Sequence, residues 1–457
     1  MNGHGAGGPA SRRQAFWRWA ARSCVALLLV AFSGPASAQP VQPPSAQPPT
    51  PPAHPQPTAP QPARALAPRI SVITFGPGDE TFSKFGHDAI LISDPRQAPA
   101  NRELVFNYGT FRFDSPSLIM DFLKGKLSYW LSVSTLERTL EVYRAFNRSV
   151  SVQELSLSPE AALAIQAFLF ENAKPENSHY RYDYYLDNCA TRIRDVLDRH
   201  LGGRLAAASQ GPAPLTYREH TRRLTVGAPF LFFGLDLAMG PLIDHPATEW
   251  QAMFLPEKVE AKLAQMTDEH GAPLVKRQRV LFDSKRPPLS QTAPGFRWGW
   301  LITGVVIGAA LYGLGHGRGR LVALAQALAL AVVGVLTGVL GSLLLVLWLL
   351  TDHAVTYWNQ NVLLCPIWAL AIPLLCLDFG RSRPKYSRLM MGVVGAAVGS
   401  SALALLLLLV LGNQATGPAV SLFLPLWLGA GVGVWVRCGK PALLSVVRAE
   451  RALPSLR

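Results

Sequence analysis

The chain has 457 residues, of which 43 are Lys or Arg and 29 are Asp or Glu, so its formal net charge is +14, and 49% of its residues are apolar. Only 16% of the residues are charged, far fewer than nucleic-acid-binding proteins display, so we expect no nucleic-acid partner despite the positive charge. The apolar fraction excludes disorder over most of the chain, and five cysteines are too few for a disulfide framework. The length allows two or three domains.

The chain is predicted to begin with an export signal and a tether. Residues 1–38 combine basic residues such as Arg18 and Arg22 with the apolar run 25–32 and end in Ala36-Ser37-Ala38. This pattern is typical of a signal peptide cleaved after Ala38, with a twin-arginine signal or an uncleaved anchor as the alternatives. Residues 39–68 are dominated by Pro, Gln and Ala, which favours an extended linker without chemistry of its own.

Residues 69–290 are predicted to form an exported α+β catalytic domain. Strand-like runs come first in this region and helical patterns come later, which favours an α+β arrangement over repeated βαβ units. The predicted strands are 70–75, 89–92 and 104–108, and the clearest predicted helices are 159–171 and 191–201.

Residues 297–437 are predicted to form a membrane domain of about five transmembrane helices, followed by a basic cytoplasmic tail at 438–457. Five apolar stretches are long enough to cross a hydrocarbon core of about 30 Å: 297–315, 321–350, 360–377, 389–411 and 419–436. The connections after the first and third stretches and the tail contain Lys and Arg, whereas those after the second and fourth contain none. The positive-inside rule therefore places residues 69–290 outside the cytoplasm, in agreement with the signal.

This topology also explains the net charge. Residues 298–457 hold 11 basic against 3 acidic residues, whereas residues 39–297 hold 28 basic against 26 acidic ones. Most of the positive excess therefore belongs to the signal and the membrane region, and the predicted exported domain is nearly neutral.

Cys189 is the only cysteine of the predicted exported domain. An unpaired thiol in an oxidising compartment is normally either buried or used, and a buried structural cysteine is one alternative. Asp187 or Asn188 is a suitable N-cap, which would place Cys189 in the first turn of a helix. There the helix dipole and the free backbone N–H groups favour the thiolate and can hold a developing oxyanion.

A cysteine nucleophile needs a base, normally a histidine, and a third polar group that orients the imidazole ring. His87 follows Gly86 at the beginning of a predicted strand and is the best candidate for the base. Asn107 lies on the next predicted strand and is the candidate orienting group. The alternatives are a solvated histidine at a strand edge and a turn asparagine before Gly109.

Three segments carry a resemblance to a known family: 85–89 (FGHDA), 107–111 (NYGTF) and 187–192 (DNCATR). They resemble the exported domain of the Lnb-type lipoprotein N-acyltransferases and, more broadly, the permuted papain-like NlpC/P60 superfamily with its lecithin-retinol acyltransferase branch. The resemblance covers roughly residues 70–290. It implies a permuted papain-like α+β fold and His87 and Cys189 as the catalytic pair, whereas the lecithin-retinol branch has a histidine in place of Asn107.

The resemblance also implies an activity. A fatty acyl chain would pass from a phospholipid to Cys189 as a thioester and then to the N-terminal amine of a lipoprotein, without a metal or other cofactor. Within the resembling segments, further residues are expected to bind substrate or support the site: Asp88, Tyr108, Asn188 and Arg192. The partners would be a phospholipid donor, a lipoprotein acceptor and the bilayer itself, with the catalytic domain on the periplasmic face of a bacterial inner membrane.

Asp352 and His353 lie at the predicted outer end of the second and third apolar stretches, below the exported domain. Ionisable residues beside membrane spans are candidates for functional groups, although an interfacial loop is the alternative. Two other functions also remain open at this point. The same machinery would suit a cell-wall cysteine amidopeptidase, and residues 69–290 could form a non-enzymatic binding domain on a membrane anchor.

Overall fold

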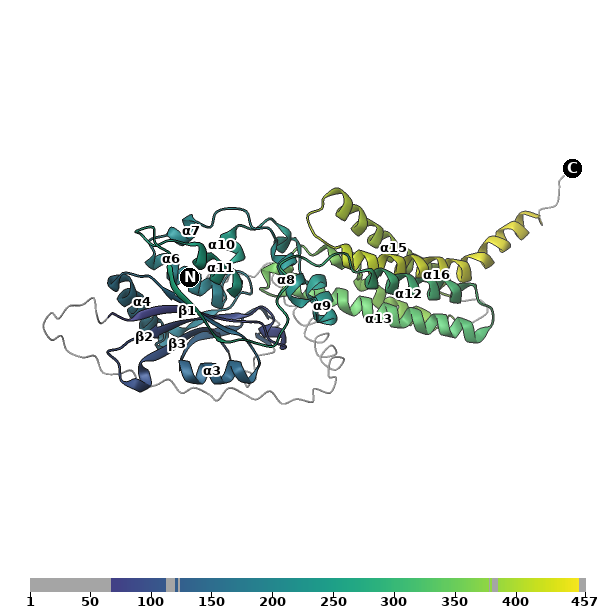
Figure 1. Ribbon diagram of the computed structural model, residues 1–457. Helices are drawn as coiled ribbons and strands as arrows, with labels where there is room; N and C mark the ends of the chain where they lie inside the picture. Colours follow the sequence, from purple (N-terminus) through teal and green to yellow (C-terminus); the bar gives the residue numbers. More distant parts are fainter. Residues whose placement is uncertain (1–66, 112–119, 122–123, 378, 380–384, 452–457) are drawn as a thin grey trace, which may run out of the picture.

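The computed structural model describes residues 67–111, 120–121, 124–377, 379 and 385–451. The predicted signal at 1–38 and nearly all of the predicted linker lie outside these residues. Figure 1 shows two parts, a domain built around a β-sheet and an elongated group of long helices that extends from one side of it.

The described strands form one antiparallel seven-stranded sheet in the order β6-β4-β3-β2-β1-β5-β7. The central strands are apolar on both sides, because β2 sends Ile90 and Ile92 to one face and Ala89 and Leu91 to the other. The sheet is therefore covered on both faces. The strands are β1 (Arg69–Phe75), β2 (His87–Ser93), β3 (Glu103–Thr110), β4 (Ser128–Thr135), β5 (Val150–Leu155), β6 (His179–Arg181) and β7 (Val275–Phe282).

One face of the sheet packs against α3 (Leu136–Ala145), and the other packs against α4 (Pro159–Asn172), α6 (Cys189–His200) and α11 (Pro256–Gln265). The helix predicted at 159–171 is confirmed, with Ser158 as its N-cap and Pro159 in its first turn. The helix predicted at 191–201 begins two residues earlier, at Cys189. The N-terminus of α6 therefore lies on the same face of the sheet as α4.

The sheet domain also contains shorter helices: α5 (Pro175–Ser178), α7 (Arg204–Ala207), α8 (Tyr217–Thr225), α9 (Pro229–Ala238), α10 (Glu249–Ala252) and the 3₁₀ helix η3 (Pro241–Asp244). Of these, α8 and α9 lie next to the long helices (Figure 1). Arg222 of α8 bonds both to Asp236 of α9 and to the carbonyl of Ala415, which precedes α16 (Gly417–Arg451).

Within the described residues, four helices are long and apolar enough to cross a membrane. The prediction of about five transmembrane helices is therefore wrong for the third stretch, 360–377, which is not one continuous helix. Residues 360–377 form only the 3₁₀ helices η5 (Gln360–Leu363) and η6 (Ile367–Ala371) and the short α14 (Ile372–Cys376). Pro366 and Pro373 each lack the N–H that a continuous helix needs, which explains the interruptions. The four long helices are α12 (Trp298–His316), α13 (Arg320–Leu350), α15 (Ser387–Val410) and α16 (Gly417–Arg451).

Glycines allow close packing among these helices. A Cβ atom at Gly429 of α16 would clash with the backbone of Gly308 in α12. A Cβ atom at Gly341 of α13 would likewise clash with the carbonyl of Cys365 in the broken segment. Small residues at such contacts let helix backbones approach closely, as membrane helices often do.

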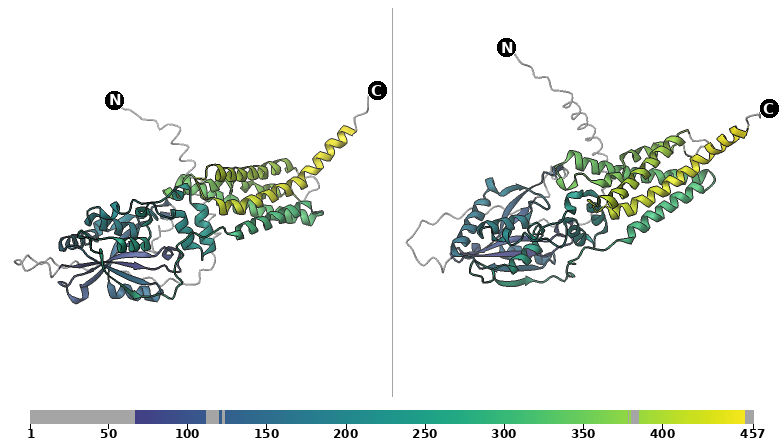
Figure 2. Two further views of the ribbon diagram at one scale, coloured as in Figure 1. Left: turned by 45° about the horizontal axis from the view of Figure 1, so that its top comes forward. Right: turned by 90° about the horizontal axis from the view of Figure 1, so that it is seen from above.

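The long helices extend away from the sheet domain side by side (Figure 2). Several hydrogen bonds hold their near ends to it, among them those from Arg297 to the carbonyl of Val226, from the amide of Asp352 to the carbonyl of Lys124, and from Arg222 to the carbonyl of Ala415. The described basic residues of the membrane region cluster at the opposite ends: Arg318, Arg320, Lys385, Arg388 and Arg437. This separation of charge is the one that the sequence pattern predicts.

Candidate functional site

The three predicted catalytic residues come together at one end of the sheet. His87 is the first residue of β2, Asn107 lies in β3, and Cys189 is the first residue of α6. His87 and Cys189 flank Gly109, where a Cβ atom would lie 3.6 Å from Cε1 of His87 and 3.5 Å from Cβ of Cys189. The backbone φ of Gly109 is +89°, a conformation that favours glycine. Gly109 therefore leaves open the space that the two reactive side chains share.

The hydrogen bond between Nε2 of His87 and Oδ1 of Asn107 selects the tautomer of the ring. Because the amide oxygen can only accept, Nε2 carries the hydrogen and Nδ1 of the neutral ring is a free acceptor. Burial lowers the pKa of His87 to about 4, although the bond to Asn107 acts in the opposite direction. At neutral pH His87 is therefore a neutral base.

Cys189 lies at the N-terminus of α6, as predicted, but its thiol is not preset as a thiolate. The backbone N–H groups of Asp88, Ala190 and Cys189 itself donate to its sulfur and favour the charged form. Burial nevertheless raises the pKa of the thiol, because the side chain is shielded from water on the covered face of the sheet. The resting pair is thus a neutral thiol beside a neutral imidazole.

Asn188 holds the start of α6 in place. Its Oδ1 accepts from the amide of Thr191 at 3.0 Å, and its Nδ2 donates to the carbonyls of Tyr184 and Phe254 at 2.9 Å each. The side chain of Thr191 accepts in return from the Asn188 amide, which completes a capping box. Asn188 therefore fixes the position of the first turn of α6, which contains Cys189.

Asp88 has a less expected environment. It is fully buried on the α6 side of β2, and neither carboxyl oxygen has a hydrogen-bond partner among the described residues. Burial raises the pKa of this carboxyl well above its usual range, so the side chain is a neutral acid. The direct contribution of Asp88 to the site is its backbone N–H, which points at the sulfur of Cys189.

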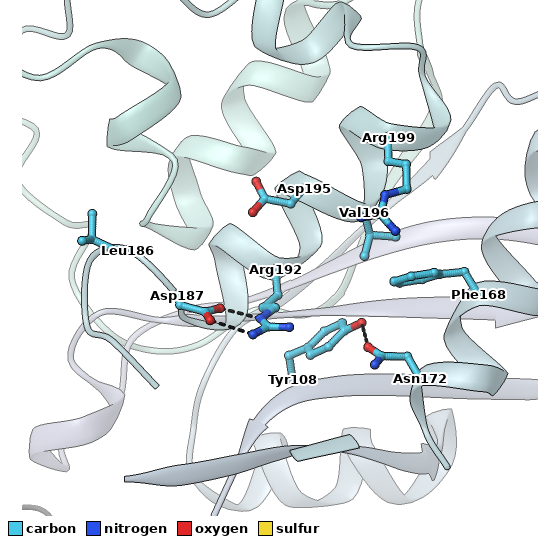
Figure 3. A pocket seen from close by; sticks show the side chains of 9 residues that line it. All are labelled: Tyr108, Phe168, Asn172, Leu186, Asp187, Arg192, Asp195, Val196 and Arg199. Carbon is cyan, nitrogen blue, oxygen red and sulfur yellow. Dashed lines mark hydrogen bonds and ion pairs between the residues drawn. The ribbon is translucent and has the colours of Figure 1, made fainter. Parts of the chain in front are cut away.

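Tyr108, which precedes Gly109 in β3, and Arg192, three residues after Cys189 in α6, line a cavity of about 380 Å³ (Figure 3). Tyr108 donates a hydrogen bond to Asn172, and Arg192 forms an ion pair with Asp187 while its guanidinium lies 4.1 Å from the ring centre of Tyr180. The remaining lining residues are Phe168, Leu186, Asp195, Val196 and Arg199. Two of the predicted supporting residues, Tyr108 and Arg192, therefore lie in the wall of this cavity, whereas Asp88 and Asn188 do not.

Tyr180 is a residue of the site that the sequence reasoning missed. Its hydroxyl lies 3.9 Å from the Cβ position of Gly109, and it has no hydrogen-bond partner in the part of the chain that the structure describes. The side chain is only 9% exposed. A buried donor at this place can stabilise negative charge on a reacting oxygen. The sequence feature that could have identified Tyr180 is its position in the tyrosine-rich segment 180–185, shortly before Cys189.

Asp352 and His353 lie apart from the reactive pair, at the junction of the two parts of the molecule. Asp352 forms ion pairs with Arg181 at 3.1 Å and Lys126 at 3.8 Å. The ring of His353 stacks on Tyr184 with 6.4 Å between ring centres. Among the residues described, no group of three or more His, Cys, Asp or Glu side chains is arranged to hold a metal ion.

Comparison with known proteins identifies the region that contains the site. Residues 63–223 match the family model for the Lnb N-terminal periplasmic domain, which confirms the resemblance drawn from the three motifs. The match includes His87, Asn107 and Cys189. Together with the four membrane-competent helices, it indicates a multi-pass membrane protein with a periplasmic domain. No curated protein and no solved structure gives a match.

Proposed function

We propose that the protein is a membrane-bound cysteine acyltransferase that moves a fatty acyl chain from a phospholipid through a Cys189 thioester to the N-terminal amine of a lipoprotein. The observation that carries this proposal is the placement of His87, bonded to Asn107, and Cys189 around Gly109. This arrangement lies in a region matching the Lnb periplasmic domain. The chain order of the three residues also supports a permuted papain-like arrangement.

In the first half-reaction, the sulfur of Cys189 attacks the ester carbonyl while its proton passes to Nδ1 of His87. Because both groups are neutral at rest, this transfer accompanies the attack and does not precede it. Backbone N–H groups at the start of α6 and the hydroxyl of Tyr180 stabilise the oxyanion. The carbon–oxygen bond then breaks, His87 protonates the departing alkoxide, and a lysophospholipid leaves.

In the second half-reaction, the acceptor amine attacks the thioester carbonyl. Neutral His87 takes one proton from the amine, the carbon–sulfur bond breaks, and the proton returns to the sulfur of Cys189. An amide is formed and the resting pair is restored, so no other reactant is needed. Asn107 keeps Nδ1 of His87 directed at the reacting atoms through both steps.

The proposal includes a location on the periplasmic face of the bacterial inner membrane. It is supported by the position of the described basic residues at the helix ends opposite the sheet domain, because such residues normally stay in the cytoplasm. A phospholipid donor and a lipid-anchored acceptor would both reach the enzyme within the bilayer.

Labelling with an alkyne fatty acid tests the function. Cells carrying the protein should form an acyl adduct on it that hydroxylamine removes, and this adduct should be absent in Cys189→Ala but present in Cys438→Ala. The masses of lipoprotein N-terminal peptides should increase by one acyl chain only when active protein is present.

Two results would contradict the acyltransferase. Cleavage of peptidoglycan fragments without an adduct would favour the cell-wall amidopeptidase. Full complementation by both Cys189→Ala and His87→Ala would favour a non-enzymatic binding domain.

A further inference from the structure

A continuous row of aromatic rings leads from the Cys189 site to the membrane region. We call Tyr129, Tyr182, Tyr184 and His353 the aromatic row. Successive ring centres are separated by 4.1 Å between Tyr129 and Tyr182, 5.6 Å between Tyr182 and Tyr184, and 6.4 Å between Tyr184 and His353. These contacts join β4, the segment after β6 and the loop after α13 into one surface.

The inner end of the row lies beside the nucleophile. Tyr129 in β4 is directly paired with Tyr180 in β6, whose hydroxyl lies at the Gly109 gap between His87 and Cys189. Tyr182 directly follows the end of β6, where its amide donates to the carbonyl of Leu127 and its ring stacks on Tyr129. Burial raises the pKa of Tyr129 and of Tyr182, and ionisation of Cys189 would raise both further, which agrees with this proximity.

The outer end of the row lies where the membrane helices begin. His353 follows the end of α13 at Leu350, and the backbone of its neighbour Asp352 is bonded to Lys124. Close by, the rings of Trp348 and Trp358 are 5.3 Å apart, and Trp358 is 71% exposed. Tryptophans in such positions are typical of the boundary between hydrocarbon and water.

Charge at this end suits a phospholipid. The side chains of Lys126 and Arg181 are 60% and 57% exposed, and both are paired with the single carboxylate of Asp352. The group therefore retains one net positive charge, which complements the phosphates of a bilayer surface. The row itself is made of uncharged tyrosine rings and one histidine, so it suits an apolar chain.

An acyl chain must partly leave the bilayer for its ester to reach Cys189. Each methylene group moved from hydrocarbon into water costs about 0.8 kcal/mol, so an unassisted transfer of several such groups would be slow. Contact with aromatic faces removes much of that cost. Tyr184 is 37% exposed and is thus accessible to such a chain.

We infer that the aromatic row is the path along which the acyl chain of the donor phospholipid reaches Cys189, with Arg181 and Lys126 near the phosphates of the surrounding bilayer surface. This inference rests on the proposed function and adds the residues that select a long-chain lipid. The chain enters beside His353, lies along Tyr184 and Tyr182, and presents its ester carbonyl at the Gly109 gap.

Tyr184→Ala in the full-length protein, reconstituted in vesicles, tests the path. The rate of Cys189 acylation is measured with dioleoyl phosphatidylethanolamine in the vesicles and, separately, with water-soluble p-nitrophenyl butyrate. We expect the rate with the phospholipid to fall at least tenfold and the rate with butyrate to change less than twofold. Tyr184→Phe should restore the phospholipid rate, and Phe146→Ala, which removes an exposed aromatic ring elsewhere, should change neither rate.

An equal loss with both substrates would mean that Tyr184 only maintains the fold of the site, and this would overturn the path. Unchanged rates with both substrates would overturn it as well. If the unmodified protein forms no acyl adduct with either substrate, the proposed function itself fails. This outcome is distinguishable from failure of the path, because it is seen without any variant.

Discussion

At the scale of single residues, the neutral state of His87 and Cys189 determines how the site should respond to pH. Protonated His87 cannot accept the thiol proton, and burial places its pKa at about 4. We therefore predict that the rate of Cys189 acylation by p-nitrophenyl butyrate falls only as pH approaches 4. A midpoint between 6 and 7 in a pH–rate profile would contradict the buried environment of the ring.

The lowered pKa of His87 also determines how this residue changes the stability of the fold with pH. The folded pKa of His87 lies below its ordinary value of 6.5, so the unfolded chain binds the proton more readily. The contribution of this residue therefore lowers the stability of the fold as pH falls from about 6.5 to about 4, and it levels off below that.

Asn107 gives a second prediction at this scale. In Asn107→Ala the Nε2 hydrogen of His87 loses its acceptor, so the ring is no longer fixed and the acylation rate should fall about 100-fold. In Asn107→Asp a carboxylate would stabilise the imidazolium, which should raise the midpoint of the pH–rate profile. Asn172→Ala removes an asparagine that bonds to Tyr108 and not to His87. Equal losses in the two alanine variants would contradict an orienting role for Asn107.

Local sequence was enough to place Cys189 at the start of a helix and His87 at the start of a strand, because a capping residue before a helical pattern and a glycine before a strand pattern are both local signals. Local sequence did not predict correctly whether the thiol of Cys189 is protonated. The helix dipole argument counts only α6, whereas the burial that raises the pKa of Cys189 comes from the packing of α6 on the sheet. Tyr180 was missed for a similar reason, since its position depends on the pairing of β6 with β4.

At the scale of elements, the start of α6 should be sensitive to substitution. Asn188→Ala removes the cap and leaves the carbonyls of Tyr184 and Phe254 without this donor, so we expect a loss of about 2–3 kcal/mol in stability together with slower acylation. Thr216→Ala removes the equivalent capping box of α8 and is the matched control. Unfolding in detergent and the acylation rate measure the two effects. Asn188→Ala with unchanged acylation would show that the cap does not position Cys189.

The contact between α12 and α16 provides a matched pair of glycines. Gly308→Leu would drive a side chain into the backbone of α16 near Pro425, whereas a Cβ at Gly313 meets no described atom within 4 Å. We expect Gly308→Leu to aggregate or unfold in detergent and Gly313→Leu to remain monodisperse by size-exclusion chromatography. Equal tolerance of both would contradict the close packing of these helices.

Hydropathy located the four long helices but overestimated the third apolar stretch. Composition alone cannot separate a continuous spanning helix from a broken segment. Residues 361–372 still run along α13 away from the sheet domain, from the bond between Asn361 and Leu237 to the contact of Ile372 with Gly334, so the chain passes to the opposite end before α15 begins. The broken segment is stabilised by contact with α13, where Gly334 and Gly341 allow its carbonyls to approach. That contact depends on tertiary structure. Within the sequence, Pro366 and Pro373 were the only indication that this stretch would not form a continuous helix.

At the scale of the whole molecule, buried polar contacts fasten the sheet domain to the membrane helices. Arg218 is 1% exposed and is bonded to Asp236 and Asp244. Arg222 links Asp236 to the carbonyl of Ala415, and Gln414 reaches the carbonyl of Met239. A buried charge network of this kind is costly to break, so the two parts should move as one unit.

Sidedness is the prediction that belongs to this scale. Alkaline phosphatase fused after Gly412, in the α15–α16 connection, should be active because it folds outside the cytoplasm. A green fluorescent protein fused to the C-terminus should fluoresce because it remains inside. The reverse pattern would contradict the orientation inferred from the basic residues.

The sequence predicted the position of Asp352 and His353 beside the sheet domain, because hydropathy acts over long segments. It did not predict the strand order or the network around Arg218. Both require partners that are distant along the chain, such as the bond from Arg222 to Ala415 across 193 positions.

The fastened connection has a kinetic consequence. With the reactive pair held at a set height above the bilayer, substrate encounters occur by lateral diffusion in two dimensions. The turnover rate should then follow the mole fraction of donor lipid in the surface. Diluting vesicles in buffer should leave it unchanged, whereas diluting the donor with an inert lipid within each vesicle should lower it.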